Sequence, residues 1–363
     1  MITLYRPSGY DSPRASSFAG RSVDNKPLDA ENGSTFKEID TGRVFRYDKE
    51  NNLWIEQKGA TSGAGATEPY IEETYDADGN LIGAKMYGYT FIRDNMYKDT
   101  TTLKTIEMPD DIRYIGNYAF SGCTNLALTS LPESLTNITN SAFYNCKNLA
   151  LTSLPAGVVS IGNDAFSGCT NLALTSLPDG LTSIGDYVFR NCTGLALTSL
   201  PAGLTSISDH TFEGCSSLAL TSLPESLTSI GQSAFSGCTN LALTSLPESL
   251  TSIGQSAFSG CTNLALTSLP AGLTNITNSA FYDCTNLALT SLPDGVVSIG
   301  ARVFQNCTSL TSITFKGTPT SIASNAFNGC TNLTDIKVPW AEGAIRNAPW
   351  GARNATITYN YTE

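Results

Sequence analysis

The chain has 363 residues and a formal net charge of −11, from 32 Asp and Glu residues against 21 Lys and Arg residues. Nucleic acids and anionic membranes are bound by clustered Lys and Arg, and no basic run occurs here, so we expect neither as a partner. No stretch approaches the roughly 18 consecutive apolar residues of a membrane span, and residues 1–20 have no apolar signal core, so we expect no membrane insertion and no export signal.

The first part of the chain is more charged than the rest. Residues 1–99 hold 12 Lys and Arg and 16 Asp and Glu, whereas residues 100–363 hold only 9 and 16, which places a boundary near residue 100. Residues 34–57 alternate apolar and polar side chains in three segments, so we predict an antiparallel meander within a small β module at residues 1–60. Residues 61–90 are predicted to be a linker and a β-hairpin that turns at Asp78-Gly79.

From Phe120 on, the chain repeats every 23 residues. Each repeat carries a Phe that is followed three residues later by a Cys; the Phe residues are Phe120, Phe143, Phe166, Phe189, Phe212, Phe235, Phe258, Phe281, Phe304 and Phe327. A period of this length with Leu at fixed offsets predicts a leucine-rich-repeat solenoid, in which each unit buries its apolar face against the next.

One repeat, residues 241–263, shows the expected course of a coil. Leu241, Leu243 and Leu246 are predicted to point inward from a first strand, and Leu250 and Ile253 from a second. Ala257 and Phe258 are predicted to begin a helical turn at the corner. The predicted fold class is therefore a β-rich solenoid of short parallel strands with helical-turn corners, preceded by a small antiparallel β module.

Both ends of the array depart from the repeat. Tyr97 stands in the Phe column before the first full coil, so residues 91–338 are predicted to form the solenoid, with a degenerate cap coil followed by the ten Phe and Cys coils. Residues 339–363 are predicted to be a C-terminal cap, in which Trp340 and Trp350 cover the last coil. Solenoids need such atypical terminal units because an open stack would associate end to end.

All ten cysteines follow the same 23-residue spacing, with one in each coil. Free Cys behaves as a small apolar side chain, so the column is interpreted as buried, reduced thiols. Pairing between neighbouring coils remains an alternative.

The outward positions are mostly Thr, Ser, Asn and Gly, and variety is confined to the corner. The candidate surface-contact residues are therefore Tyr144, Tyr187, Arg190, His210, Tyr282 and Arg302. His210, the only histidine, is interpreted as a solvated surface residue. A selective contact by the array is expected to use this corner.

No catalytic motif, phosphate loop or metal-binding spacing occurs, so we expect no enzyme activity, no catalytic residues, no cofactor and no metal. Asp76 to Asn80 resembles the start of a calcium loop, but Tyr87 stands where the loop needs Glu, which favours a hairpin turn. Carboxylates follow the proline in several coils, and Glu225 and Glu248 lie in adjacent ones. With no cleft around them, they are interpreted as solvated turn residues.

The repeat P-x-S/G-L/V-T-S-I-G-x-x-A-F-x-G/N-C-T-x-L resembles the BspA-type (Treponema-like) leucine-rich repeat over residues 91 to 338. This family occurs in bacterial surface adhesins, protist surface proteins and phage-encoded proteins. Residues 33–54 also resemble a module near the start of phage structural proteins. Residues 338–351 resemble the C-terminal tail of prophage-encoded BspA-like proteins.

These resemblances imply a phage structural protein, a fibre or receptor-binding component located on the virion, made in the host cytoplasm and released by lysis. Residues 1–60 would attach to other virion proteins, with Phe36, Phe45, Tyr47 and Trp54 as candidate attachment residues. The rod would bind a bacterial surface glycan or protein, and the chain could form a homo-oligomer such as a trimer. The alternatives are a bacterial BspA-like cell-surface adhesin and an architectural capsid or collar decoration protein without adhesion.

Overall fold

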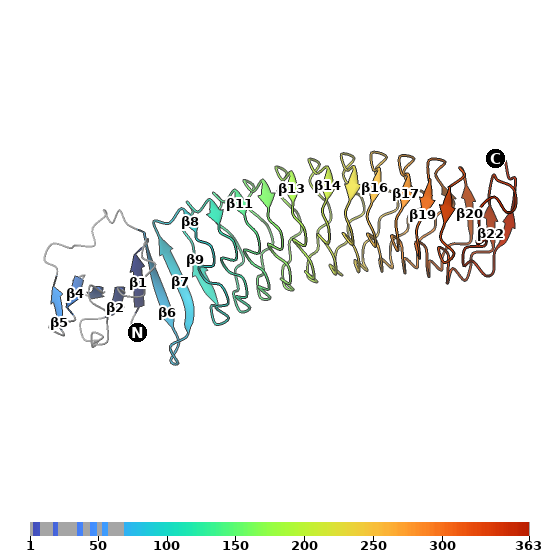
Figure 1. Ribbon diagram of the computed structural model, residues 1–363. Helices are drawn as coiled ribbons and strands as arrows, with labels where there is room; N and C mark the ends of the chain where they lie inside the picture. The colour runs from blue at the N-terminus through green and yellow to red at the C-terminus, as the bar shows by residue number, and fades with distance from the viewer. Residues whose placement is uncertain are drawn as a thin grey trace.

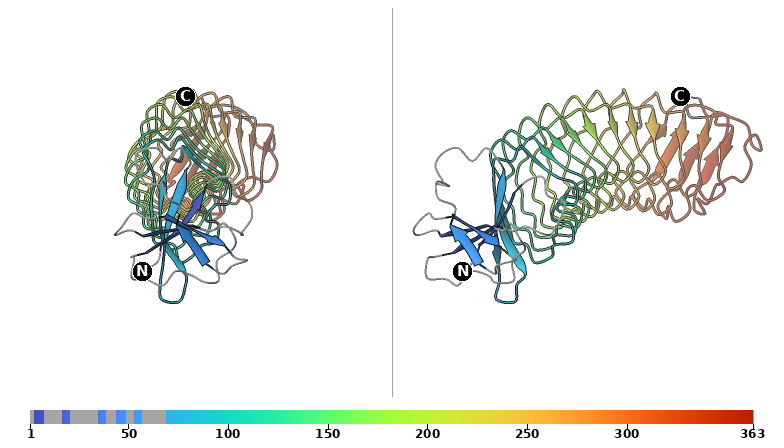
Figure 2. Two further views of the ribbon diagram at one scale, coloured as in Figure 1. Left: turned by 90° about the vertical axis from the view of Figure 1, so that its left-hand side faces the viewer. Right: turned by 60° about the vertical axis from the view of Figure 1, so that its left-hand side comes forward.

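The computed structural model describes residues 69–362 and, before them, the backbone of five strands. These strands are β1 (Thr3–Pro7), β2 (Ser17–Gly20), β3 (Thr35–Glu38), β4 (Val44–Asp48) and β5 (Leu53–Glu56). Figure 1 shows a sheet at the N-terminal end and a gently curved rod of stacked coils that runs to the C-terminus. Figure 2 shows the same rod nearly end-on and from an oblique side.

The N-terminal sheet has eight strands in the order β5-β4-β3-β2-β1-β6-β7-β9. The meander predicted over residues 34–57 is present as the antiparallel pairs β3 with β4 and β4 with β5. Strands β1 and β2 were not predicted. Because β2 pairs with β3 in parallel, the sheet is mostly but not entirely antiparallel. The division of the chain at residues 60, 90 and 338 stays a prediction.

The predicted hairpin is formed by β6 (Tyr70–Tyr75) and β7 (Leu81–Tyr87). Its turn is closed by the Asp76 carboxylate, which accepts the backbone N–H of Asp78 at 3.0 Å and that of Asn80 at 2.8 Å. This is the local role of Asp in turns. Strand β9 (Thr105–Glu107) then pairs with β7 in parallel and joins the sheet to the first coil.

Each coil of the rod contributes one short strand, and most of these strands pair in parallel with the strand 23 residues on, as Ser160 does with Ser183. No such pairing joins the strands of Ser183 and Ser206 or those of Ser252 and Asn275. These strands are β8 (Phe91–Ile92), β10 (Tyr114–Ile115), β11 (Asn137–Ile138), β12 (Ser160–Ile161), β13 (Ser183–Ile184), β14 (Ser206–Ile207), β15 (Ser229–Ile230), β16 (Ser252–Ile253), β17 (Asn275–Ile276), β19 (Ser298–Ile299) and β21 (Ser321–Ile322). The Ile is buried and the residue before it faces outward. The second strand of the coil is confirmed.

The first strand predicted within each coil is wrong for the middle of the rod. Leu241, Leu243 and Leu246 are buried as predicted, but their backbone forms no strand. Two successive outward residues, Thr244 and Ser245, break the alternation that a strand requires. A following proline, which has no N–H to donate, then prevents pairing.

Such a strand does form at the C-terminal end, in a sheet of β18 (Ser291–Leu292), β20 (Ser312–Phe315), β22 (Asp335–Lys337) and β23 (Thr356–Thr358). Lys316 stands there in place of the proline, one coil after Pro293. Its backbone N–H donates to Leu292 O at 3.1 Å.

The predicted helical corner is also wrong, because residues 69–362 contain no helix. The corner is a chain of tight turns in which the backbone N–H groups alternate in direction. Ser121 N–H donates to Tyr118 O at 3.1 Å within the coil, whereas Phe120 N–H donates to Ala142 O at 2.8 Å in the next coil. A helix would bond every N–H along its own axis and leave none for the neighbouring coil. This alternation is why Tyr118 and Gly122 have positive φ, at 56° and 77°.

The core is a column of stacked Phe rings. Neighbouring centroids are 5.2 to 5.8 Å apart and the rings are nearly parallel. Tyr97 begins the stack at 5.5 Å from Phe120. At the other end Trp340 and Trp350 are buried and meet Phe315 edge-on or tilted, at 5.2 and 5.9 Å.

All ten cysteines are free and buried, in agreement with the reduced-thiol interpretation. Each thiol donates to the carbonyl of the aromatic residue in the preceding coil, as Cys238 Sγ does to Phe212 O at 3.0 Å. Burial in this column raises the pKa of every thiol, to about 12 for Cys123 and Cys330 at its two ends. The cysteines are therefore neutral core side chains at neutral pH.

Candidate functional site

Three of the predicted contact residues lie together at the corner of two adjacent coils. Tyr187 and His210 occupy the same position 23 residues apart, both with positive φ (59° and 55°). Their side chains therefore leave the backbone in the same direction, and the rings stack at 4.5 Å with 6° between their planes. The Arg190 guanidinium lies 5.7 Å from the centre of the Tyr187 ring.

Glu213 connects this cluster. Its Oε2 accepts from Arg190 Nε at 3.0 Å and contacts His210 Nδ1 at 2.9 Å. The His210 side chain is only 16% exposed, so its interpretation as a solvated surface residue is wrong. The His ring is held between a stacked Tyr ring and a carboxylate because the coil pitch brings these columns into contact. Within the cluster, Arg190 Nε and His210 Nδ1 both contact Glu213, and the Tyr187 and His210 rings cover each other on one face.

A nearby carboxyl is also affected by this packing. Asp164 stands one coil before Tyr187 in the same column. Burial raises the pKa of the Asp164 carboxyl, the Arg190 charge opposes this rise, and the neighbouring Asp186 adds to it.

The other predicted contact residues are not brought into this cluster. Tyr144, Tyr282 and Arg302 lie in separate coils, and Tyr144 is 38% exposed. The corner is thus not a single site, and the contact role of all six residues stays a prediction. The side chains of Phe36, Phe45, Tyr47 and Trp54 lie outside the described residues.

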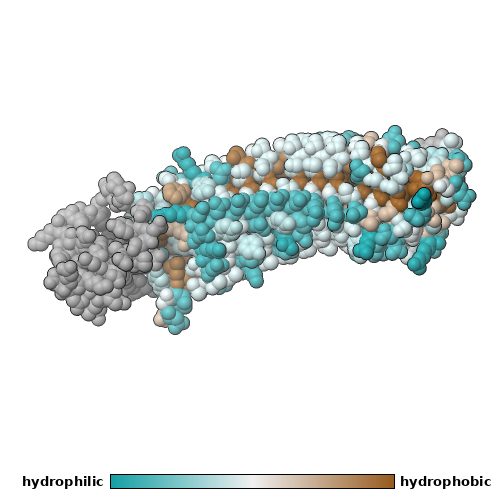
Figure 3. All heavy atoms as spheres, in the orientation of Figure 1, coloured by the Kyte–Doolittle hydropathy of each residue, from teal (hydrophilic) through white to brown (hydrophobic). Residues whose placement is uncertain are grey.

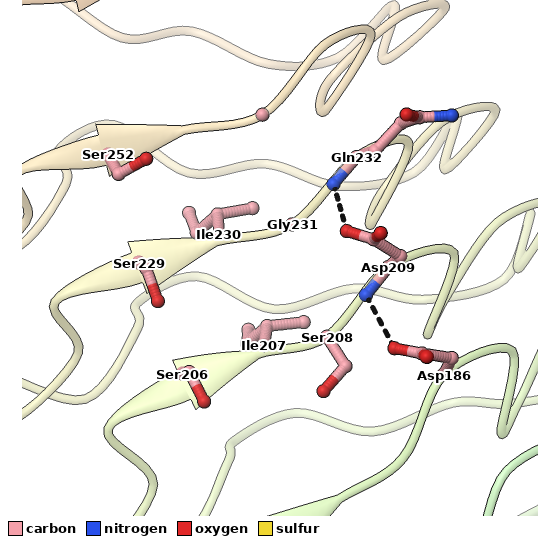
Figure 4. A pocket seen from close by; sticks show the side chains of 11 residues that line it. Asp186, Ser206, Ile207, Ser208, Asp209, Ser229, Ile230, Gly231, Gln232 and Ser252 are labelled. Atoms are coloured by element: carbon pink, nitrogen blue, oxygen red, sulfur yellow. Dashed lines mark hydrogen bonds between the residues drawn. The ribbon is translucent and has the colours of Figure 1, made fainter.

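The structure shows a second feature, a shallow polar trough beside the short strands, which the sequence reasoning missed. Figure 4 shows one length of it, with a volume of about 490 Å³, between a wall of outward Ser side chains and a wall of Asp and Gln side chains. The first wall includes Ser206, Ser229 and Ser252, and the second Asp209 and Gln232. A second length, of about 410 Å³, begins at Tyr114 and ends at Ser183.

A ladder of side chains builds one wall of the trough. From Asn140 to Asp209, the side-chain oxygen of each Asn or Asp accepts the backbone N–H of the residue one coil later. Asn163 Oδ1 accepts the N–H of Asp186 at 3.0 Å, and Asp209 Oδ1 accepts that of Gln232 at 2.6 Å. The signal for it in the sequence is the column Asn140, Asn163, Asp186 and Asp209, which keeps the 23-residue step.

The wider surface is polar. Figure 3 shows mostly polar and neutral residues on this face of the rod, with one narrow apolar stripe along its length.

Glu225 and Glu248 are exposed, and within residues 69–362 no group of three or more His, Cys, Asp or Glu could hold a metal ion. No helix among these described residues is long and apolar enough to span a membrane. The expectation that the chain is not an enzyme stays a prediction.

Comparison with known families agrees with the coil geometry. The model for the BspA type leucine rich repeat region matches in six copies over residues 90–219, 171–288 and 205–334. The chain belongs to this family. The matched repeats cover residues 90–334 of the rod. A search of curated proteins found no match.

Solved structures include similar leucine-rich repeat proteins. A leucine-rich repeat protein from Bacteroides ovatus is 22% identical with a TM-score of 0.51, over 80% of this chain and 98% of that one. The leucine rich repeat protein of T. pallidum is 28% identical over 66% of this chain and 87% of that one, with a TM-score of 0.33. A leucine rich cell surface protein from Faecalibacterium prausnitzii is 24% identical over 93% and 96%, with a TM-score of 0.40. The first of these supports the solenoid fold.

Proposed function

We propose that this protein is an adhesion protein that presents its solenoid as a long, repetitive binding surface. The observation that supports this most is the polar surface repeated coil after coil along the rod, with Ser and Asn or Asp columns at a constant step. Weak contacts repeated in this way gain strength through multivalency. The BspA-type repeat, with its buried core given over to Phe, Leu and Cys, leaves binding to its surface.

More specifically, we propose that the protein is a structural component of a phage particle, a fibre or receptor-binding protein from which the rod projects. This proposal is supported by the resemblance of residues 33–54 and 338–351 to segments of phage and prophage proteins. Residues 1–60 would bind other virion proteins, with Phe36, Phe45, Tyr47 and Trp54 in or beside strands β3, β4 and β5. Ten reduced thiols fit assembly in a reducing cytoplasm followed by release through lysis. Association as a homo-oligomer such as a trimer belongs to the same proposal.

The partner on the bacterium would be a surface glycan or protein. The proposed selective contacts are the corner residues Tyr144 and Arg302, which are exposed, and Tyr282, which is partly buried. Tyr187, Arg190 and His210 form the more rigid cluster at the same edge. A triple variant with Ser at Tyr144, Tyr282 and Arg302 should keep the fold and bind bacterial cells less well than the parent chain.

Two measurements test the proposal. Purified full-length protein labelled with a fluorophore should bind cells of the host strain, and gold-labelled antibody to residues 100–363 should mark the tail of purified phage particles. Gold on the head or collar, without cell binding, would support an architectural role. Label on the bacterial envelope and none on particles would instead support a bacterial cell-surface adhesin.

A further inference from the structure

The two lengths of polar trough follow one another along the rod, and strand pairing is interrupted between β13 and β14, where they meet. The length that begins at Tyr114 ends with Ser183 and Asn163, and the length shown in Figure 4 begins one coil later with Ser206 and Asp186. The same two columns therefore line both lengths. Tyr114 to Ser252 spans six coil steps, which at about 4.8 Å per step gives a trough roughly 29 Å long.

The ladder fixes which polar atoms face the trough. Asn140 Oδ1 accepts the N–H of Asn163 at 2.9 Å, and Asn163 Oδ1 accepts that of Asp186 at 3.0 Å. An amide NH2 cannot accept a hydrogen bond, so each of these amides must turn its oxygen to the ladder and its NH2 away from it. These two NH2 groups are left as pre-oriented donors.

The ladder changes character in the second half of the trough. Asp186 and Asp209 each use one carboxylate oxygen for the ladder, at 3.2 and 2.6 Å. Their second oxygens can only accept hydrogen bonds. A ligand that lies along the trough thus meets donors first and acceptors later.

The opposite wall and the N-terminal end add two further kinds of contact. Ser183, Ser206 and Ser252 are exposed, and their hydroxyl groups can both donate and accept. At the end, Tyr114 lines the trough and is 37% exposed, and Phe91, its strand neighbour, is 47% exposed. Exposed rings beside ordered polar groups are typical of ligand sites.

We propose that this trough binds a linear, uncharged polysaccharide lengthwise, with a sugar ring against Tyr114. This proposal rests on the adhesion function proposed above and names its ligand class. Sugar hydroxyls both donate and accept, so one chain can satisfy amide donors, serine hydroxyls and carboxylate acceptors in turn. A chain of ammonium groups can only donate hydrogen bonds, so it would match only the carboxylate half of the ladder.

Charge excludes the other common wall polymers. No Lys or Arg lines either length of the trough, and Arg190 at the corner is paired with Glu213. Asp186 and Asp209 would repel a phosphate-bearing chain, and the net charge of the protein is −11. An anionic polymer is therefore the wrong ligand.

The structure offers a matched pair of variants. In N140D/N163D each amide donor becomes a carboxylate, and the fold tolerates this because Asp186 and Asp209 already occupy the same column. The control N240D/N263D makes the same charge change at two exposed residues outside the trough. Full-length protein would be tested on an array of linear uncharged hexasaccharides, their disaccharides, and polyglycerol phosphate.

We expect one or more uncharged hexasaccharides to bind, the matching disaccharide to bind more weakly, and polyglycerol phosphate not to bind. N140D/N163D should lose between about tenfold and a hundredfold in affinity, from two lost donors. The control should stay within about twofold. Y114A should lose about tenfold and Y114F should retain affinity, because the ring rather than its hydroxyl makes the contact.

The inference is overturned if no uncharged hexasaccharide binds, if polyglycerol phosphate binds better, or if the two double variants behave alike. Binding of the parent chain and of N140D/N163D to whole bacterial cells separates this failure from that of the adhesion function. If both proteins bind cells equally well, the trough is not the binding site, but the adhesion function is still supported. If the parent chain does not bind cells, the proposed adhesion function is wrong.

Discussion

The buried cysteine column should make the rod unfold at mildly alkaline pH. Burial raises the pKa of each thiol above its value of 9.0 in the unfolded chain, so folding favours the protonated form. Above pH 9 the unfolded chain releases protons that the folded chain keeps. The stabilisation is therefore complete below pH 9 and is lost as the pH rises toward the folded-state pKa values.

The size of this effect follows from the number of thiols. Each buried thiol lowers the free energy of unfolding by about 1.4 kcal/mol for every pH unit above 9. All ten cysteines are buried, and even the end ones, Cys123 and Cys330, have a pKa of about 12. The sum is about 14 kcal/mol per pH unit, against a typical total stability of about 5 to 15 kcal/mol. Unfolding is expected between about pH 9 and 10.5.

The assay is urea unfolding of the full-length chain, followed by circular dichroism at several pH values between 7 and 10 under reducing conditions. The comparison variant carries Ala at Cys215, Cys238 and Cys261. It should be less stable at neutral pH because buried side-chain atoms are lost, but its dependence on pH should be flatter by about 4 kcal/mol per unit. An unchanged slope in this variant would refute the reasoning.

Three further predictions concern the core and its ends. Native protein should not react with an alkylating thiol reagent at pH 8, whereas denatured protein should react at all ten cysteines; rapid native labelling would contradict the burial of the column. Phe258→Ala should lower the free energy of unfolding by about 3 to 5 kcal/mol, because the ring stacks on both neighbours at 5.5 Å, while Ser259→Ala should change it by less than about 0.5 kcal/mol in the same urea titration. Lys316→Pro should cost about 1 to 3 kcal/mol through the lost bond to Leu292 O, and an unchanged thermal midpoint would argue against the C-terminal sheet.

The repeat itself was sufficient to predict the solenoid, its inward residues and its buried thiols. A side chain that recurs at every 23rd position must meet its own copy in the next coil, so the Phe and Cys columns follow from the period alone. The second strand of each coil and the hairpin at Asp78-Gly79 likewise follow from local residue types. These features need only short-range rules and the condition that coils stack.

Other features depended on how neighbouring coils share backbone hydrogen bonds. The corner looked helical because Ala257 and Phe258 favour a turn, yet every second N–H there is used between coils, which a helix cannot allow. The predicted first strand is absent from most coils because a proline there has no N–H to donate to the neighbouring coil. Near the end of the rod Lys316 replaces this proline, and the strand forms.

In the candidate sites, too, the sequence identified residues, whereas contacts between coils determined their arrangement. Sequence variety singled out Tyr187, Arg190 and His210, but their stacking and the role of Glu213 required the coil pitch and the left-handed backbone at the corner. The Asn and Asp column was visible as a pattern, whereas its use as a ladder that orients amide donors was decided by the distance between coils. Periodicity is a property of the chain, but the direction of a hydrogen bond belongs to the assembled stack.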